Sequence, residues 1–296
     1  PITHDGGFRG AVAANALASL AKLAPGRIQC GIGTGFTARR SMGLGAIPLA
    51  EIEAYIEVLR GLLANETVEA EIEGEQRKIR FLNPELGLID TTGPIPFHLS
   101  AFGPKGRRLA ATLGIDWLIP VRSNAATMAQ IEDMHSAWRE AGREPGDLYT
   151  TAQAGGCILA EGEPADSKRA MAQAGPQASM VLHDLVEAEA YGSLGITVPP
   201  PLRPALEAYR EIYQAYRPED ARYLSVHAGH LMVVRPEERH LIDADMIKAL
   251  SFTGTAAELR ERIRELRDAG FRQFSAHIRH DQPQMVEEWA DLLAGV

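Results

Sequence analysis

The stretch CGIGTGFTARR, residues 30–40, places three glycines at alternate positions before a phenylalanine and two arginines. Glycine has no side chain, so a strand that ends in glycines lets a flat ligand or another backbone come close. Alternate residues of a strand share a face, which leaves Gly31 and Gly33 on an almost bare face. The pattern predicts either ligand contact at Gly33 and Gly35 or only a tight turn, since no helix opens on the third glycine as a dinucleotide fingerprint requires.

A second glycine-containing turn, FGPKGRR at residues 102–108, is expected to join a strand to a helix. Free backbone amides at a helix start bind anions, and Gly103 and Gly106 would let an oxyanion approach them. The three cations at this end oppose the helix dipole, which costs stability unless an anion is present. We therefore expect Gly103, Pro104, Lys105 and Gly106 to hold a phosphate, and surface cations reaching into solvent are the alternative.

Two histidines and an arginine are further candidates. His227 and His230 lie in SVHAGHLMVV, residues 225–234, which has the pattern of a strand. Positions three apart on a strand face opposite sides, so we expect no metal site there, and either histidine acts in catalysis or is hydrogen-bonded within the wall. Arg122 ends another expected strand, where a guanidinium can hold an anionic or carbonyl substrate; the alternative is that this turn only lets Asn124 cap the next helix.

Composition excludes several classes of protein. The 296 residues, 45% of them apolar, can bury a large core in one domain or two. Thirty basic against 39 acidic residues give a net charge of −9, which argues against a nucleic-acid partner. No apolar run approaches the ~20 residues of a membrane span and no leader is evident, so we expect a cytoplasmic protein. Cys30 and Cys157 are too few for a disulfide framework or a zinc cluster, and we expect buried thiols.

Short apolar runs alternate with longer amphipathic ones, which is the pattern of repeated strand and helix units. Expected strands cover residues 28–32, 95–101, 116–121, 149–159, 223–234 and 271–278, and expected helices cover 49–63, 107–113, 125–141 and 255–270. A hairpin is expected over 68–82, and Thr255 with Glu258 forms a capping box at the start of the last of these helices. Residues 164–216 interrupt the alternation with two helical stretches around a triple proline, which indicates an insertion. This order favours a parallel sheet, closed as a barrel or open, with active residues at the carboxyl ends of the strands.

Four segments resemble the luciferase-like monooxygenase superfamily, including its deazaflavin-dependent branch similar to methylenetetrahydromethanopterin reductase. They are GRIQCGIGTGFTARRSMG, AEIEAYIEVLRGLL, PIPFHLSAFGPKGRRLAATLGIDWLI and TGTAAELRERIRELRDAGFRQF, in the order and spacing of the family. The resemblance implies one domain over residues 1–296, a (β/α)8 TIM barrel of the bacterial luciferase type. The insertion at 164–216 would precede the seventh strand. The first strands of the family are expected to be absent from this sequence, which leaves the barrel N-terminally incomplete.

The resemblance also implies a cofactor, FMN or deazaflavin (coenzyme F420), at the carboxyl face. Gly33, Thr34 and Gly35 would lie beside its ring, and the turn over residues 103–106 would hold its phosphate. Phe36 and Arg122 would line the substrate pocket. Deazaflavin-dependent relatives often carry an acidic residue at the position of Phe36, so the chemistry of that acid does not transfer to this chain.

The function implied is a flavin- or deazaflavin-dependent oxidoreductase or monooxygenase that acts on a small organic substrate. A homodimer is expected, with a flavin reductase or another supplier of reduced cofactor as partner. The alternative is a flavin-independent hydrolase or lyase, for example an amide-cleaving enzyme, that uses His227 or His230 on the same barrel.

Overall fold

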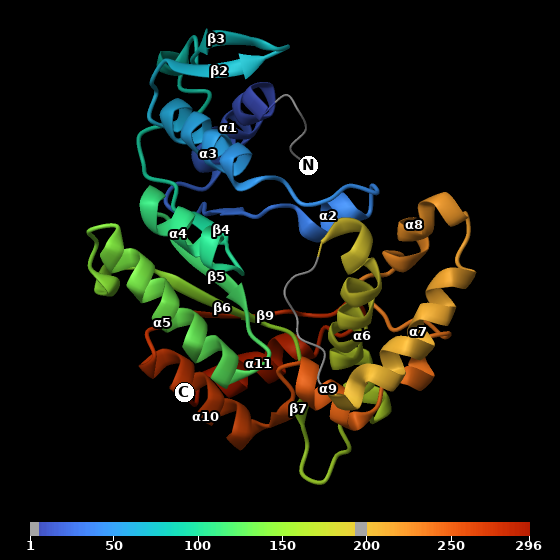
Figure 1. Cartoon of the computed structure of the whole chain (residues 1–296). Coiled ribbons are helices and arrows are strands. Elements are labelled where there is room, and N and C mark those ends of the chain that lie inside the picture. The colour runs from blue at the N-terminus through green and yellow to red at the C-terminus, as the bar shows by residue number, and fades with distance from the viewer. Residues whose placement is uncertain (1–5, 193–199) are drawn as a thin grey trace.

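Five parallel strands form the central sheet of the computed structural model, which describes residues 6–192 and 200–296 (Figure 1). In spatial order they are β1 (Cys30–Ile32), β4 (Phe97–Ser100), β5 (Asp116–Pro120), β6 (Thr150–Ala154) and β9 (Gln273–Ala276). The predicted α/β class with a parallel sheet is confirmed. Among the described residues no strand pairs with the outer edge of β1 or of β9.

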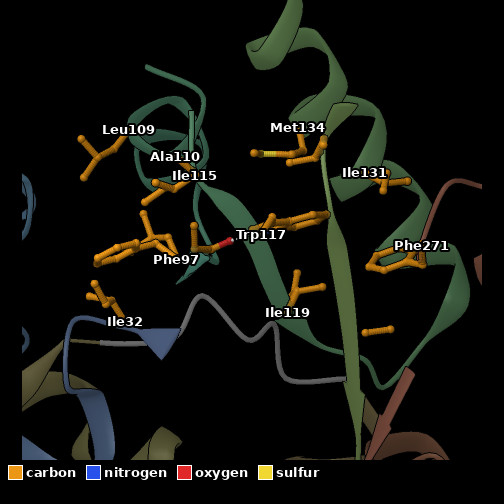
Figure 2. Packing of buried hydrophobic residues seen from close by; sticks show 14 of the residues in the cluster. Ile32, Phe97, Leu109, Ala110, Ile115, Trp117, Ile119, Ile131, Met134 and Phe271 are labelled. Carbon is orange, nitrogen blue, oxygen red and sulfur yellow. Dashed lines mark hydrogen bonds between the residues drawn. The ribbon is translucent and has the colours of Figure 1, made fainter. Parts of the chain in front are cut away.

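One face of the sheet is apolar and carries the main core. In-register rows such as Ile32, Leu99 and Trp117 lie on this face and are almost fully buried. The helices whose buried apolar residues pack on it are α3 (Leu49–Leu63), α4 (Pro104–Leu113), α5 (Asn124–Glu140), α10 (Ala256–Asp268) and α11 (Met285–Leu293). Figure 2 shows Trp117 at the centre of this packing, between Phe97 and Ile119 of the sheet and Met134 of α5. Its indole N–H donates to the carbonyl of Ala101 at 2.9 Å, which satisfies the one polar atom of a side chain with no exposed surface.

The opposite face of the sheet carries polar residues. The alternation of the strands places Gly31, His98 and Asp116 in one row, and Ser100, Thr151 and Gln273 belong to the next row of the same face. Parallel sheets are normally apolar on both faces, because helices cover both. A polar face on a parallel sheet therefore indicates a surface at which ligand or further chain is recognised.

The central sheet and the helices that pack on it form one unit, which we call the sheet unit, and further elements extend it. Helix α1 (Gly6–Leu23) packs on α3 and on the antiparallel hairpin of β2 (Val68–Ile72) and β3 (Glu75–Ile79). The short strands β7 (Ile158–Leu159) and β8 (Gly254–Thr255) pair in parallel, so the strand expected over 149–159 is in fact broken after Ala154. Single 3-10 turns cover Pro84–Leu86, Pro145–Asp147, Pro200–Leu202, Glu219–Ala221 and Arg239–Leu241. No described helix is long and apolar enough to cross a bilayer.

Four helices form a second unit with its own apolar core, which we call the helical unit. They are α6 (Lys168–Tyr191), α7 (Arg203–Ala215), α8 (Arg222–Val226) and α9 (Ala244–Leu250). The unit continues well beyond residue 216, and the insertion over 164–216 stays a prediction. Residues 193–199, which include the first residue of the triple proline, lie outside the described residues.

The strand expected over 223–234 is also wrong, since this segment consists of α8 and a series of turns. Gly229 and Leu231 adopt left-handed backbone conformations, with φ of 67° and 60°, which an extended strand cannot contain. Met232 and Val233, whose apolar side chains suggested a buried strand, are about half exposed. Hydrogen bonds from His227 and His230 to α6 hold the segment in this form instead.

Candidate functional site

The glycines after β1 lie at the carboxyl end of the strand, as predicted. A Cβ added at Gly31 would meet no atom within 4 Å, and one added at Gly33 would lie 3.6 Å from Cβ of Ser100, an ordinary contact. Packing therefore does not require glycine at either position, and the strand end is open to a ligand. Gly35 differs, because its φ of 74° lies in the left-handed region that favours glycine. It is the N-cap of helix α2 (Phe36–Arg40). The Thr34 carbonyl accepts from the backbone N–H of Ile47 at 3.0 Å, which fixes this loop.

The second predicted turn lies at the start of α4, at the carboxyl end of the neighbouring strand β4. Gly103 is the exposed N-cap with no side-chain cap, and Pro104 and Lys105 are exposed beside it. Gly106 has a packing role instead, because a Cβ there would lie 3.2 Å from Cβ of Ala101. This turn keeps the free amides and the exposed lysine of an anion site.

Arg107, one of the three cations of that turn, is not available to an anion. Its guanidinium is buried and pairs with Asp133 of α5 at 2.5 Å, and it also donates to the carbonyl of Phe102 at 2.6 Å. Sequence alone did not distinguish it from Lys105 and Arg108, which are exposed.

Arg122 lies at the carboxyl end of β5 and is half-buried, with its Nε atom buried and without a hydrogen-bond partner in the described structure. Burial lowers the pKa of its guanidinium, and the charge of Asp184 partly opposes that shift. The neighbouring Asn124 does not cap α5, since its amide donates to Arg262 and Glu265 and Ser123 is the N-cap. The side chain of Phe36 lies outside the described part of the structure.

Sequence reasoning missed the buried ion pairs that join α2 to α6. Arg40 is 1% exposed, and its guanidinium bonds Asp184 at 2.9 Å and lies 3.8 Å from the Glu187 carboxylate. Burial lowers the pKa of Arg40, while the two carboxylates oppose the shift. The available signal was the presence of His183, Asp184 and Glu187 about one helical turn apart among the apolar residues of 180–186. These pairs place α6 beside α2 and so beside the loop of Gly33 to Gly35 that precedes it (Figure 1).

Two further polar groups at the carboxyl face and on the polar sheet face were also missed. His98 is 5% exposed, and neither of its ring nitrogens has a hydrogen-bond partner in the described structure. Arg279 follows β9, and burial lowers its pKa to about 10. Its guanidinium donates only to neutral acceptors, the carbonyls of Gln173 and Leu231 and the amide of Gln177, and no described carboxylate pairs with it. A buried cation without a carboxylate is costly, so this corner of the site favours a negatively charged group.

His227 and His230 lie side by side, not on opposite faces as a strand would place them. Their ring centroids are 5.1 Å apart, and His227 Nε2 lies 2.9 Å from the carboxylate of Glu187. The turns after α8 bring both rings to the same side. Within the described ranges, no three His, Cys, Asp or Glu side chains lie close enough together to hold a metal ion.

A cavity of about 420 Å³ lies at the other end of the sheet, against the amino ends of β4 and β5. It is lined by residues such as Arg60, Pro94, Phe97 and Asp116. Active residues of parallel α/β sheets gather at the carboxyl ends, so we assign this cavity no catalytic role.

A parallel sheet with helices on its apolar face and polar groups at its carboxyl ends defines an α/β protein with an enzyme-like site. The model of the luciferase-like monooxygenase family matches residues 8–273, and the chain belongs to that family. The 5,10-methylenetetrahydromethanopterin reductase of Methanolobus tindarius is 26% identical over 171 residues, which are 57% of this chain. The match spans 50% of the length of that curated relative.

Solved structures with the same fold include oxidoreductases that use two different cofactors. The coenzyme F420 dependent tetrahydromethanopterin reductase of Methanopyrus kandleri has a TM-score of 0.60 at 20% identity, over 94% of this chain and 76% of that one. An F420-dependent secondary alcohol dehydrogenase has a TM-score of 0.59 at 16% sequence identity, and the match covers 97% of this chain and 75% of that one. A third structure is the oxygenating constituent of 3,6-diketocamphane monooxygenase from Pseudomonas putida in complex with FMN. It has a TM-score of 0.55 at 14% sequence identity, and the match covers 99% of this chain and 76% of that one. At these identities the likeness establishes the luciferase-like fold.

Proposed function

We propose that this protein is an oxidoreductase that binds FMN or the deazaflavin coenzyme F420 at the carboxyl ends of β1 and β4 and acts on a small organic substrate. The observation that carries the proposal is the bare strand end at Gly31 and Gly33, in a family whose solved relatives include F420-dependent and FMN-bound enzymes. When bound, such a ring supplies hydride transfer or the activation of oxygen.

The residues of the strand ends fit a flat, polar ring. Gly31 pairs in register with His98, so the open strip lies directly beside an imidazole whose nitrogens have no partner in the described structure. A buried polar atom without a partner is costly, and a ring that carries carbonyl and N–H groups would satisfy it. Gly33, Thr34 and Gly35 would contact the ring from the adjoining loop, while Phe36 and Arg122 would border the substrate.

The start of α4 would hold the phosphate of the cofactor. Gly103, Pro104 and Lys105 are exposed, and Gly106 would contribute its backbone N–H at the positive end of the helix. Lys105 adds a positive charge beside these amides. A flavin reductase or other supplier of reduced cofactor, a homodimeric assembly and a cytoplasmic location remain predictions from the family resemblance.

The phosphate assignment is tested by Gly103→Asp with Gly103→Asn as its matched control. Gly103 has extended backbone and open space around it, and aspartate and asparagine are both good N-caps, so both variants should keep or slightly raise the melting temperature. Only the aspartate places a negative charge where the phosphate would sit. Loss of one charge-assisted hydrogen bond costs ~1.5–3 kcal/mol, which is roughly ten- to a hundredfold in affinity.

The measurement is a titration of FMN and of coenzyme F420 into each protein, followed by absorbance and fluorescence of the ring, together with melting of each protein alone. We expect weakened binding in Gly103→Asp and near-normal binding in Gly103→Asn. Equal affinities would overturn the phosphate assignment. If the unaltered protein binds neither ring, the proposed function fails and the flavin-independent hydrolase or lyase becomes the better hypothesis.

A further inference from the structure

A cavity of about 580 Å³ lies between the first turns of α6, the turns after α8 and the loop that follows β9. Its lining comes from three segments, within residues 168–172, 232–239 and 280–282. The carboxylates of α6 that bind Arg40 lie at the other end of this helix, next to α2 (Figure 1). At 1.5 Å per residue, Ala172 and Asp184 are roughly 18 Å apart along the helix axis. The cavity is therefore remote from the glycine loop at the end of β1.

One wall of the cavity is apolar. Met171 of α6 is buried there, and Met232, Val233 and Val234 line it from the turns after α8. Met232 and Val233 are 46% and 49% exposed. Single exposed apolar side chains are common on proteins, but these two are adjacent and both line the same cavity. An apolar wall in a cavity of this volume is typical of a site for a small molecule.

Positive charge lies beside the apolar wall. Lys168 and Arg239 line the cavity, are exposed, and make no ion pair within the described ranges. Arg169 also lines it, but its guanidinium is already paired with Glu163 and Glu288. Two cations are thus available to a ligand.

Little negative charge balances these cations. Of the described residues that line the cavity, only Asp281 has a carboxylate, and it lies 3.3 Å from Nε2 of His280. The chain as a whole carries a net charge of −9, so a site rich in cations contrasts with the rest of the protein. The local field favours an anion.

A further cation is buried directly behind the cavity. Arg279, which precedes the lining residue His280, is 5% exposed. Its guanidinium donates to the carbonyl of Gln173 on α6 at 3.1 Å and to the carbonyl of Leu231, next to Met232, at 2.8 Å. Arg279 therefore ties the three lining segments together. Burial lowers its pKa to about 10, so it stays charged at neutral pH, and no described carboxylate compensates that charge.

We propose that this cavity binds a small organic carboxylate with an apolar body, such as a medium-chain or aromatic acid. Its carboxylate would lie toward Lys168 and Arg239, and its apolar part would lie against Met232 and Val233. A free phosphate suits the site less, because a strongly hydrated dianion gains nothing from an apolar wall. A neutral apolar molecule would leave the cations, including Arg279, without a counter-charge. This site is additional to the proposed cofactor site and does not depend on which ring the protein binds.

Octanoate is the probe, titrated by calorimetry into the protein without cofactor, with 1-octanol and octylammonium as ligands of matched chain length. We expect octanoate to bind ~10- to 100-fold more tightly than octanol, because only octanoate makes charge-assisted contacts. Octylammonium should bind most weakly. Octanoate should also raise the melting temperature, since it binds the folded state and not the unfolded chain.

Substitutions separate the charged and the apolar part of the site. Lys168→Gln with Arg239→Gln changes two exposed side chains, so the fold should be kept. Exposed ion pairs contribute up to about fivefold each, so octanoate should bind this double variant roughly five- to twentyfold more weakly, and octanol should bind as before. Arg210→Gln removes an exposed charge on α7 outside the cavity and is the matched control, with unchanged affinity for octanoate. Met232→Gln keeps the length of the side chain and should weaken both octanoate and octanol.

Methyl NMR of protein labelled at methionine gives the position of the probe. We expect octanoate to shift the signals of Met171 and Met232 and to leave Met134, in the core of the sheet unit, unchanged. The Met232→Gln variant identifies the Met232 signal by its loss. A second titration with the protein saturated by FMN or coenzyme F420 should give the same affinity for octanoate.

Several results would overturn the proposal. They are no binding of octanoate below ~10 mM, equal affinity for octanoate and octanol, a double variant that binds octanoate like the parent, and shifts at Met134 in place of Met232. If octanoate fails and an acidic tripeptide containing leucine binds instead, the cavity is part of a protein-docking surface. If octanoate competes with a bound ring, the cavity belongs to the cofactor site and is not a second site. If no ring binds but octanoate binds as expected, the proposed function fails and this inference stands.

Discussion

The sheet unit and the helical unit bury different chemistry. The core of the sheet unit is built from aliphatic and aromatic side chains such as Leu99, Trp117 and Ile131. The helical unit has an apolar core of its own, but next to it lies a continuous run of buried polar groups. These include Gln173, Gln177, Ser179, His183, Asp184, Glu187, Arg235 and Glu238. Apolar burial stabilises a fold without specifying chemistry, whereas buried ion pairs contribute little net stability and do fix the positions of protons.

The comparison assigns a different task to each unit. The sheet presents backbone at the open ends of its strands, which suits the binding of a flat ring. The helical unit presents buried polar groups that are joined through Arg40 to α2, the helix that follows the end of β1. Partly satisfied buried networks are costly, and in the described part of this unit several acceptor atoms, among them Glu187 Oε1, His230 Nε2 and Glu238 Oε2, have no hydrogen-bond partner. This supports the hypothesis that the unit serves a ligand.

The largest effect on stability is expected from Glu238→Ala. Glu238 is fully buried, accepts from His183 and pairs with Arg235, so its removal leaves the buried guanidinium with only the more exposed Glu237, at 3.7 Å, as counter-charge. Breaking a buried pair in this way costs ~3–5 kcal/mol. Glu207→Ala is the control, because Glu207 is exposed on α7 and its loss should change stability by less than ~0.5 kcal/mol.

Urea unfolding gives the free energies, and hydrogen exchange locates the loss. We expect faster exchange in α6 and α7 and little change in β5 or α5. Equal effects of the two substitutions would mean that the cluster is not a buried ion-pair network, and the contrast between the units would lose its basis.

The sheet unit was predictable from sequence because its elements follow local rules. The helix over 49–63 is found with the predicted ends, since its apolar residues recur at helical spacing and face the core. The capping box of Thr255 and Glu258 is confirmed, with both of its hydrogen bonds present. Glycines at a strand end were placed correctly at the carboxyl face, because parallel strands all end on the same side.

The helical unit was not predictable because its structure depends on long-range polar pairs. The apolar residues of 223–234 suggest a strand, and the bonds of His227 to Glu187 and of His230 to His183, 40 and 47 positions apart, explain why the segment turns. Likewise, nothing local distinguishes the buried Arg40 from the less buried Arg39. Sequence patterns predict which residues are apolar and where chains turn, but they do not show which charges will pair across the fold.

The next largest effect concerns pH. The pKa of His230 is about 3 in the folded protein, against an ordinary value near 6.5, and His183 shifts in the same direction. Between these values the unfolded chain binds more protons than the fold, so the stability that neutral His230 contributes is complete above ~6.5 and is lost as pH falls. Each proton changes the free energy of unfolding by at most ~1.4 kcal/mol per pH unit.

Unfolding free energies between about pH 7 and about pH 5 test this, because histidine titrates there while carboxylates stay ionised. The other charged or titratable groups near His230 are kept unchanged; they are His183, His227, Glu238 and Arg235. His230→Gln should reduce the slope of stability against pH, and His240→Gln should leave it as in the parent. A slope that does not respond to His230→Gln would show that the ring is free to protonate in the fold.

The smallest effect belongs to the sheet unit and is local. Thr255 caps α10, with its hydroxyl accepting from the Glu258 N–H at 3.4 Å and its own N–H donating to the Glu258 carboxylate at 2.7 Å. Thr255→Ala removes the first bond and keeps the second, so we expect a loss of ~1 kcal/mol. Ser123→Ala is the matched control, because Ser123 is the N-cap of α5 but makes no side-chain cap bond and should lose much less. Since neither cap touches the polar cluster, both variants should keep the pH dependence of the parent. If Thr255→Ala instead altered that dependence, the two units would be coupled through α10, and the division between an apolar scaffold and a polar, proton-handling unit would have to be abandoned.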